Sequence, residues 1–273
     1  MSSQKIAFIG AGNMAKAIIG GLTAEGFPRL SLTATGPRIE SLQKTGDSLG
    51  IPVTTDNRYA ASTADVVVLS VKPQLLKEVC LDLAPALAHK PLIISVAAGI
   101  TTDSINTWLG GGHAIVRCMP NTPSSVRSGA SGLYANSKVS DLHKSLANSI
   151  LGAVGVVQWV TDERLINPVT AVSGSGPAYF FLMMEAMIDA GEKLGLSRET
   201  ATELTLQTAL GAAILAKQSE FDVAELRRRV TSPKGTTEQA ILSFEQDDIR
   251  GTFERAMSAC NNRAIELSEL LGK

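Results

Sequence analysis

A short apolar run leads directly into a glycine turn near the start of this 273-residue chain. Residues 5–15 read KIAFIGAGNMA, a strand followed by the pattern G-x-G-x-x-A at the opening of a helix. Gly10 permits the tight turn, Gly12 lets the backbone approach a pyrophosphate, and Ala15 lets the helix pack closely on the strand. The N–H groups and dipole at the helix N-terminus favour an anion. This segment therefore predicts a dinucleotide-binding unit.

The first half of the chain alternates apolar, β-branched runs with helical stretches. Continuous apolar strands joined by crossover helices predict a mostly parallel sheet with both faces covered. The clearest helices are expected at residues 14–25 and 73–88. Strands are expected at residues 5–9, 31–34, 66–71, 92–96 and 115–118, with later strands at 129–135 and 156–160 that extend the sheet at one edge.

After about Thr161 the strand pattern disappears, and residues 163–273 show helical periodicity. Residues 178–194 are apolar nearly all round, so we expect this helix to be buried in a core or in a subunit interface. Residues 200–217 are similar in character. A helical region this apolar is expected to complete its core with a second chain. The predicted fold class is therefore α/β followed by all-α.

Composition and charge exclude several classes of protein. The formal net charge is −1 without a long basic run, which argues against nucleic acid or a membrane surface as a partner. No stretch approaches ~18 apolar residues, and a first strand at residue 5 leaves no room for a signal peptide. The three cysteines lack C-x-x-C spacing and the three histidines are isolated. We therefore expect reduced thiols in a cytoplasmic protein and no metal site.

The end of the second strand indicates which nicotinamide cofactor binds. NAD-binding units carry an acidic residue there, about 20 residues past the glycines, but residues 32–38 read LTATGPR. Thr35 can donate a hydrogen bond and Arg38 can neutralise a 2′-phosphate. An exposed arginine at a helix start would also explain Arg38 without a ligand. We expect NADP(H) rather than NAD(H), with Lys72 facing the cofactor's phosphates or ribose.

Five further blocks appear in order along the chain, namely VKPQ (71–74), SVAAGI (95–100), RCMPNTP (117–123), VSGSGPAY (172–179) and VTSPKGTT (230–237). With the glycine turn they resemble the pyrroline-5-carboxylate reductases, over essentially the whole chain. The resemblance implies a doubly wound, Rossmann-type dinucleotide-binding domain over residues 1–161. It further implies a helical substrate-binding and dimerisation domain over residues 162–273.

The same resemblance implies an activity and an assembly. The activity is NADPH-dependent reduction of 1-pyrroline-5-carboxylate to L-proline, the last step of proline biosynthesis, with NADH as a weaker donor. The assembly is a homodimer, and such dimers often associate further into a decamer.

The resemblance also implies the ligand-binding residues. The cofactor would contact Asn13, Met14, Thr35, Asn57, Val71, Lys72 and Ala98, in addition to Gly10, Gly12, Ala15 and Arg38, which the turn and the end of the second strand already indicate. The substrate would lie against residues 230–237, through Val230, Ser232, Gly235, Thr236 and Thr237. The family usually has glycine where this chain has Lys234, which adds a charge beside the expected carboxylate site.

The chemistry of a cyclic imine fits these residue types. The N–H groups of a loop running into a helix, with nearby hydroxyls, suit a small carboxylate, although an ordinary N-cap also favours Thr and Ser. A protonated imine is already an electrophile, so we expect Thr237 to orient the ring nitrogen and assist proton transfer without being indispensable. Ser175 is expected near the substrate, although a plain helix start with Pro177 in its first turn explains that segment equally well.

Two other interpretations stay open. β-Hydroxyacid dehydrogenases share this architecture but need a lysine as general acid–base one turn into the helix after the second glycine motif. Here no basic residue follows Gly176 until Lys193, and alcohol oxidation without a proton acceptor is difficult. The second is an NADP(H)-binding protein without enzymatic activity, because a fold does not fix a function. Turnover of an imine distinguishes the three.

Overall fold

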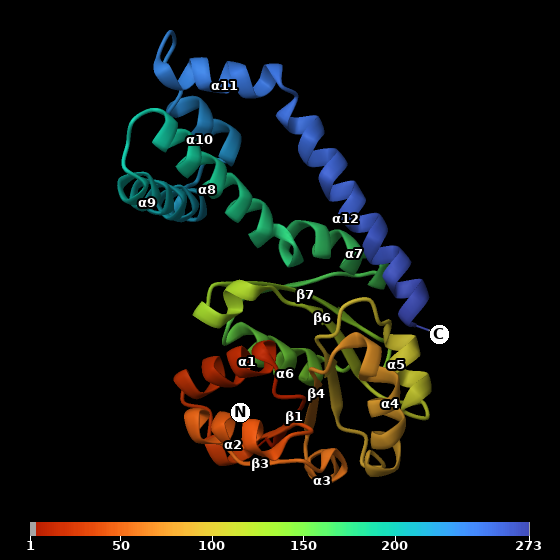
Figure 1. Ribbon diagram of the computed structural model, residues 1–273. Helices are drawn as coiled ribbons and strands as arrows, with labels where there is room; N and C mark the ends of the chain where they lie inside the picture. The colour runs from red at the N-terminus through yellow and green to blue at the C-terminus, as the bar shows by residue number, and fades with distance from the viewer. Residues whose placement is uncertain (1–3, 273) are drawn as a thin grey trace. The chain divides into compact units, whose positions relative to one another are not determined.

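The structure, a computed structural model, describes residues 4–272, and an eight-stranded sheet organises its first half (Figure 1). The strand order is β3-β2-β1-β4-β5-β6-β7-β8. It reverses between β1 and β4, which is the switch point of a doubly wound sheet. The bounds are β1 Ile6–Ile9, β2 Leu32–Thr35, β3 Val53–Thr54, β4 Val66–Leu69, β5 Leu92–Ser95, β6 Ile115–Met119, β7 Gly129–Ala135 and β8 Gly155–Trp159.

The sheet is parallel except at one step. The strands from β3 to β6 pair in parallel, β7 runs antiparallel to β6, and β8 is parallel to β7. Residues 120–128 connect β6 to β7 through the 3₁₀ helix η3 (Thr122–Val126). This connection is shorter than the dozen or more residues that a parallel crossover needs, so the chain reverses instead. The two later strands do extend the sheet at one edge, as predicted. The two-residue β3 escaped prediction because so short a segment carries no periodicity.

Helices cover both faces of the sheet, which confirms the doubly wound class. Alternate strand residues face two apolar clusters, with Phe8 and Val68 in one and Ile9 and Val67 in the other. The first cluster includes α1 (Asn13–Ala24) and α6 (Asp141–Gly152) and is joined by the end of α2 (Ile39–Leu49). The second cluster includes α3 (Asn57–Ser62), α4 (Pro73–Leu83) and α5 (Thr102–Trp108).

The helix expected over residues 73–88 is shorter in the structure. Pro73 is its first residue, where a proline needs no N–H partner. However, α4 ends at Leu83 and the chain continues as the 3₁₀ turn η2 (Ala84–Ala86). Pro85 has no N–H to donate to the preceding turn, so the α-helical hydrogen bonding stops there.

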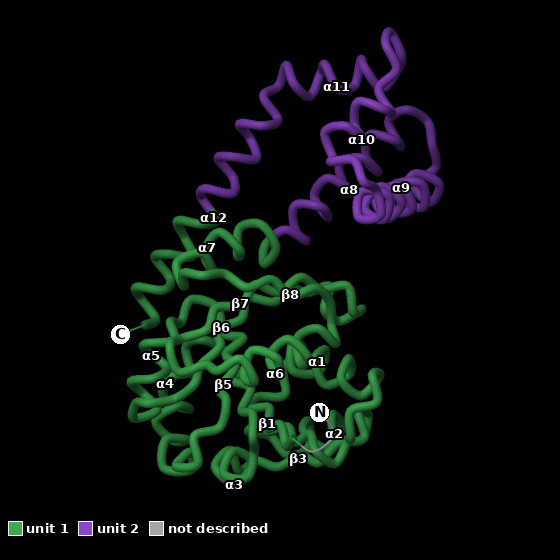
Figure 2. Tube along the Cα trace, turned by 180° about the vertical axis from the view of Figure 1, so that it is seen from behind, with its two compact units in different colours: residues 1–175, 260–273 green, residues 176–259 purple. Residues whose placement is uncertain are grey.

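After β8 the described chain is helical, which confirms the second half of the predicted fold class. Its elements are η4 Glu163–Leu165, α7 Ile166–Val169, the π-helical turn η5 Thr170–Gly174, α8 Gly176–Lys193, α9 Arg198–Gln218, α10 Val223–Arg229, α11 Thr236–Gln246 and α12 Ile249–Leu271. Contacts group the chain into two units (Figure 2). Unit 1 holds the residues up to Ser175 and those from Cys260 on, and unit 2 holds residues 176–259.

The apolar helix expected at residues 178–194 is α8, and within a single chain it is not buried. Phe180, Phe181 and Leu182 are 58%, 63% and 66% exposed. On α9, several leucines and an isoleucine are also exposed, namely Leu204, Leu206, Leu210, Ile214 and Leu215. The prediction that α8 is buried in a core of this chain is therefore wrong. A subunit interface, the other predicted location, remains for its apolar surface.

Candidate functional site

The turn after β1 can be built only with glycine at its first position. Gly10 has φ +101°, and a Cβ there would lie 2.9 Å from the carbonyl oxygen of Ser70 and 3.0 Å from Val71 Cγ1. The Ser70 hydroxyl, which the sequence analysis did not single out, donates to the Gly10 carbonyl at 2.6 Å. The loops after β1 and β4 therefore touch at the switch point, where open α/β sheets bind ligands.

Gly12 differs from Gly10, because the protein itself leaves room for a side chain there. Its φ is −74°, and a Cβ would come no closer than 3.8 Å, to Ser70 O. Gly12 is the N-cap of α1 and supplies no side-chain acceptor. Among the described residues, none accepts a hydrogen bond from the N–H groups of Asn13, Met14 and Ala15. The arrangement leaves space and three donors for an anion.

Thr35 and Asn57 are brought to the same turn. The buried Thr35 hydroxyl donates to Asn57 Oδ1 at 2.6 Å and accepts from the Gly10 N–H at 3.3 Å. Its proton is therefore engaged within the protein, and its role in this structure is to hold the ends of β1, β2 and α3 together. The expected donation from Thr35 to a cofactor is not the hydrogen bond seen here.

Two cations flank the glycine turn. A cavity of about 340 Å³ is lined by Gly12, Arg38 and Lys72, with Ala11, Gly36, Pro37, Ser41, Leu42 and Thr45 completing the wall. Arg38 is the N-cap of α2 and Lys72 the N-cap of α4. No carboxylate belongs to this lining. The cavity therefore has the charge and the hydrogen-bond donors to hold a phosphate group.

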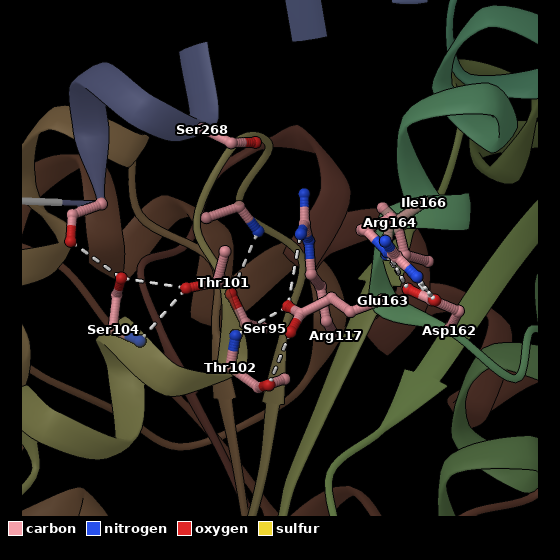
Figure 3. A network of polar contacts seen from close by, with 12 residues as sticks. Ser95, Thr101, Thr102, Ser104, Arg117, Asp162, Glu163, Arg164, Ile166 and Ser268 are labelled. Carbon is pink, nitrogen blue, oxygen red and sulfur yellow. Dashed lines mark hydrogen bonds and ion pairs between the residues drawn. The ribbon is translucent and has the colours of Figure 1, made fainter. Parts of the chain in front are cut away.

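The loop that carries Ala98 joins β5 to α5. Gly99 in this loop has φ +73°, and a Cβ there would lie 3.4 Å from Leu267 Cβ on the last turns of α12. The start of α5 is held by Glu163, which accepts from both the N–H and the hydroxyl of Thr102 (Figure 3). Glu163 also accepts from the buried Arg117. The sequence analysis quoted Arg117 within a block but assigned neither residue a role.

Asn121 connects two of the recognised blocks. Its side-chain amide donates to the Ser173 carbonyl at 3.0 Å, and its carbonyl oxygen accepts from the Ala130 N–H at 2.9 Å. Two residues on, the Ser175 hydroxyl accepts from the Cys260 thiol at 3.3 Å. In the sequence, Asn121 stands out only through its place in the block 117–123. Nothing there identifies Ser173 or Ala130 as its hydrogen-bond partners.

In unit 2, the loop expected to bind a carboxylate lies between α10 and α11. Gly235 is the N-cap of α11 and has no side chain to satisfy the helix. Within the described chain, the N–H groups of Thr236, Thr237 and Glu238 have no hydrogen-bond partner. Thr236 and Thr237 lie in the first turn of the helix and are exposed. A plain Ser or Thr N-cap, the alternative explanation of these residues, is therefore not what the structure contains.

Lys234 occupies a backbone conformation that favours glycine. Its φ is +61° and its side chain is exposed. Its N–H donates to Glu238 Oε2 at 2.8 Å, so one donor of the loop is already engaged. Val230 and Ser232 are exposed in the same loop, and the Ser232 carbonyl accepts from the Gly235 N–H at 3.0 Å.

Other chemistries find little support in residues 4–272. No three His, Cys, Asp or Glu side chains within this range gather as a metal ion would require. None of the helices described is long and apolar enough to cross a membrane. Cys80 and Cys118 are buried, and burial raises the pKa of each thiol to about 12.

Models of known families match two parts of the chain. The model described as pyrroline-5-carboxylate reductase dimerisation matches residues 163–267. The model described as NADP oxidoreductase, coenzyme F420-dependent, matches residues 5–99. The chain therefore has an NADP-binding domain at its start and a dimerisation domain after it, so it self-associates.

Full-length relatives agree with these matches. The chain is 57% identical to the pyrroline-5-carboxylate reductase of Pseudomonas aeruginosa, with all of both chains covered. A solved pyrroline-5-carboxylate reductase from Coxiella burnetii has a TM-score of 0.94 and 50% identity, covering 97% of this chain and 99% of its own. The Plasmodium falciparum enzyme, solved with NADP bound, has a TM-score of 0.88 and 30% identity, covering 98% and 99%.

Proposed function

This chain belongs to the pyrroline-5-carboxylate reductase family, and we propose that it reduces 1-pyrroline-5-carboxylate to L-proline by hydride transfer from NADPH to the cyclic imine. The observation that carries the proposal is 57% identity to a curated member over the full length of both chains. The glycine turn and the loop before α11 supply an anion site each, as a dinucleotide and a carboxylate substrate require.

NADPH is the proposed donor, with NADH as a weaker one. Arg38 and Lys72 line a cavity beside Gly12 that contains no carboxylate to repel a 2′-phosphate. The free N–H groups of Asn13, Met14 and Ala15 suit the pyrophosphate. Val71, Asn57 and Thr35 are further proposed contacts of the cofactor, and Ala98 is the proposed contact of the nicotinamide ring. NADPH, when bound, supplies the hydride.

The substrate carboxylate is proposed to bind the loop before α11. The unpaired N–H groups of Thr236 and Thr237 and the hydroxyl of Ser232 are its donors there, with Val230 and Gly235 shaping the loop. The Thr237 hydroxyl orients the ring nitrogen and helps to pass its proton. Ser175 is a further proposed contact of the substrate. Because the protonated imine is already an electrophile, most of the acceleration comes from positioning.

Self-association follows from the dimerisation domain, and we propose a homodimer that assembles further into a decamer. The exposed apolar side chains of α8 and α9 support the dimer, because a surface of this kind is costly to leave in water.

The test is the loss of NADPH absorbance with 1-pyrroline-5-carboxylate. We expect turnover by the wild-type protein and weaker turnover by the Thr237→Ala variant. We expect Arg38→Ala to lower kcat/KM with NADPH while leaving kcat/KM with NADH nearly unchanged, because only NADPH carries the 2′-phosphate. A folded, NADPH-binding protein that turns over no imine would refute the proposal.

A further inference from the structure

An ion pair between the buried Arg117 and Glu163, whose side chain is 18% exposed, lies beside the loop that carries Ala98. Arg117 is the third residue of β6 and only 4% exposed, and its Nη1 donates to Glu163 Oε1 at 3.2 Å (Figure 3). Arg117 is paired in register with Ser95, the last residue of β5. The backbone of Arg117 thus lies beside the point where the chain leaves β5 and enters residues 96–101.

Glu163 reaches from η4 to the other end of the same loop. Its Oε1 accepts from the Thr102 N–H at 2.7 Å, and its Oε2 accepts from the Thr102 hydroxyl at 2.9 Å. Thr102 is the first residue of α5. One carboxylate therefore joins the start of α5, at the far end of residues 96–101, to β6, and the pairing of β5 with β6 holds the near end.

The energetics of this pair indicate more than stability. Burial lowers the pKa of the Arg117 guanidinium, and Glu163 opposes that effect. Buried ion pairs often contribute no net stability relative to apolar side chains of similar size, because both ions lose their hydration. The pair instead fixes the relative positions of Arg117, Glu163 and Thr102, because the two carboxylate oxygens of Glu163 accept three hydrogen bonds from the other two residues.

The exposed pair next to it shows the contrast. Asp162 binds Arg164, which belongs to the same short element η4, and their side chains are 38% and 90% exposed. Neither residue makes a hydrogen bond to α5 or to β6 in the described structure. Charge at this end of η4 is therefore not enough to anchor the loop, and of these three neighbouring residues Glu163 is the one that binds α5 and β6 in the described structure.

We infer that Glu163, held by Arg117, is a positioning residue that fixes residues 96–101 against the nicotinamide end of the cofactor. The inference rests on the proposed function, since Ala98 is the proposed nicotinamide contact. Glu163 touches neither substrate nor cofactor in this role. It acts through Thr102 and the backbone of the loop.

The test compares Glu163→Gln with Asp162→Asn, which neutralises the neighbouring carboxylate. Glutamine leaves Arg117 without its counter-ion and disturbs the hydrogen bonds to Thr102. We expect kcat to fall on the order of tenfold in Glu163→Gln, because small displacements of reacting groups are costly. We expect KM for the imine to change little. With NADPH carrying deuterium at C4, the isotope effect on kcat should rise, and Asp162→Asn should match the wild type in all three quantities.

A second variant separates positioning from folding. Arg117→Met with Glu163→Leu replaces the pair by apolar side chains of similar length and leaves no unpaired charge. Because Thr102 is 2% exposed and loses the acceptor of its N–H and hydroxyl, the melting temperature should fall, but the protein should stay folded. The lowered kcat and the raised isotope effect should persist in it, because no carboxylate holds Thr102. Wild-type kcat and isotope effect in this folded double variant, or equal values in Glu163→Gln and Asp162→Asn, would overturn the inference.

Failure of the proposed function would look different. A wild-type protein without imine turnover refutes that function, whatever the variants do. The anchoring itself is then read from amide hydrogen exchange without substrate. The Thr102 amide should exchange faster in Glu163→Gln than in Asp162→Asn, and equal exchange would refute the anchoring.

Discussion

At the scale of single residues, backbone conformation distinguishes positions that look alike in the sequence. Lys234 stands at φ +61°, where a side chain with a Cβ is strained. The chain thus keeps a charged side chain beside the proposed carboxylate site at a conformational cost. An exposed cation there adds attraction that salt screens.

Replacing this residue by glycine should stabilise the protein. Lys234→Gly is expected to raise the free energy of unfolding by up to ~1 kcal/mol, because glycine adopts positive φ without strain. The same change at Lys217, in the last turn of α9, should lower it by about 0.5–1 kcal/mol. Chemical denaturation measures both, and a Lys234→Gly variant less stable than the wild type would contradict the strain.

The buried thiols give the protein a dependence on alkaline pH. Burial raises the pKa of Cys80 and Cys118 from 9.0 to about 12, so both stay protonated in the folded chain when the unfolded chain loses these protons. Their contribution to stability is therefore complete below pH 9 and is lost as the pH rises from about 9 to 12. A Cys80→Ala, Cys118→Ala variant should show a shallower fall in unfolding free energy over this range. The same pH dependence of the unfolding free energy in variant and wild type would contradict the raised pKa values of the two thiols.

At the scale of elements, the sequence predicted what local rules control. The strand, turn and helix over residues 6–24 and the helical character of the chain after β8 were expected, because each follows from periodicity or a glycine within one segment. Boundaries were less accurate. The expected helix over 73–88 extended too far, through Pro85.

The glycine turn offers an element-scale test. Gly10→Ala should destabilise the fold, because it combines φ +101° with a Cβ 2.9 Å from a carbonyl oxygen. Gly12→Ala should leave the melting temperature nearly unchanged and weaken NADPH binding by about tenfold or more, since its Cβ meets only the space proposed for the pyrophosphate. Calorimetry and fluorescence titration measure the two effects. Full NADPH affinity in Gly12→Ala would place the pyrophosphate elsewhere.

At the scale of the whole molecule, we expect a second copy of the chain to cover the exposed apolar surface of unit 2. Leu182 is 66% exposed on a helix of the dimerisation domain, and burying one leucine side chain contributes roughly 1.5–3 kcal/mol. Leu182→Glu should therefore shift the protein towards monomer in sedimentation at micromolar concentration. Lys144→Glu on α6 makes a larger change in charge and should leave the association unchanged. An unaltered oligomer in Leu182→Glu would exclude the exposed face of α8 from the interface.

The sequence by itself determined the dinucleotide turn, the order of strands and helices and the family, because each is written in a contiguous segment of residues. Tertiary structure alone decided which distant side chains meet. Glu163 lies 46 residues from Arg117, and Asn121 lies 52 residues from Ser173. These partners depend on which strands become neighbours and on the reversal at β7, which the length of one connection sets. The charge of a side chain follows from its residue type, but the topology of the sheet determines which counter-ion lies beside it.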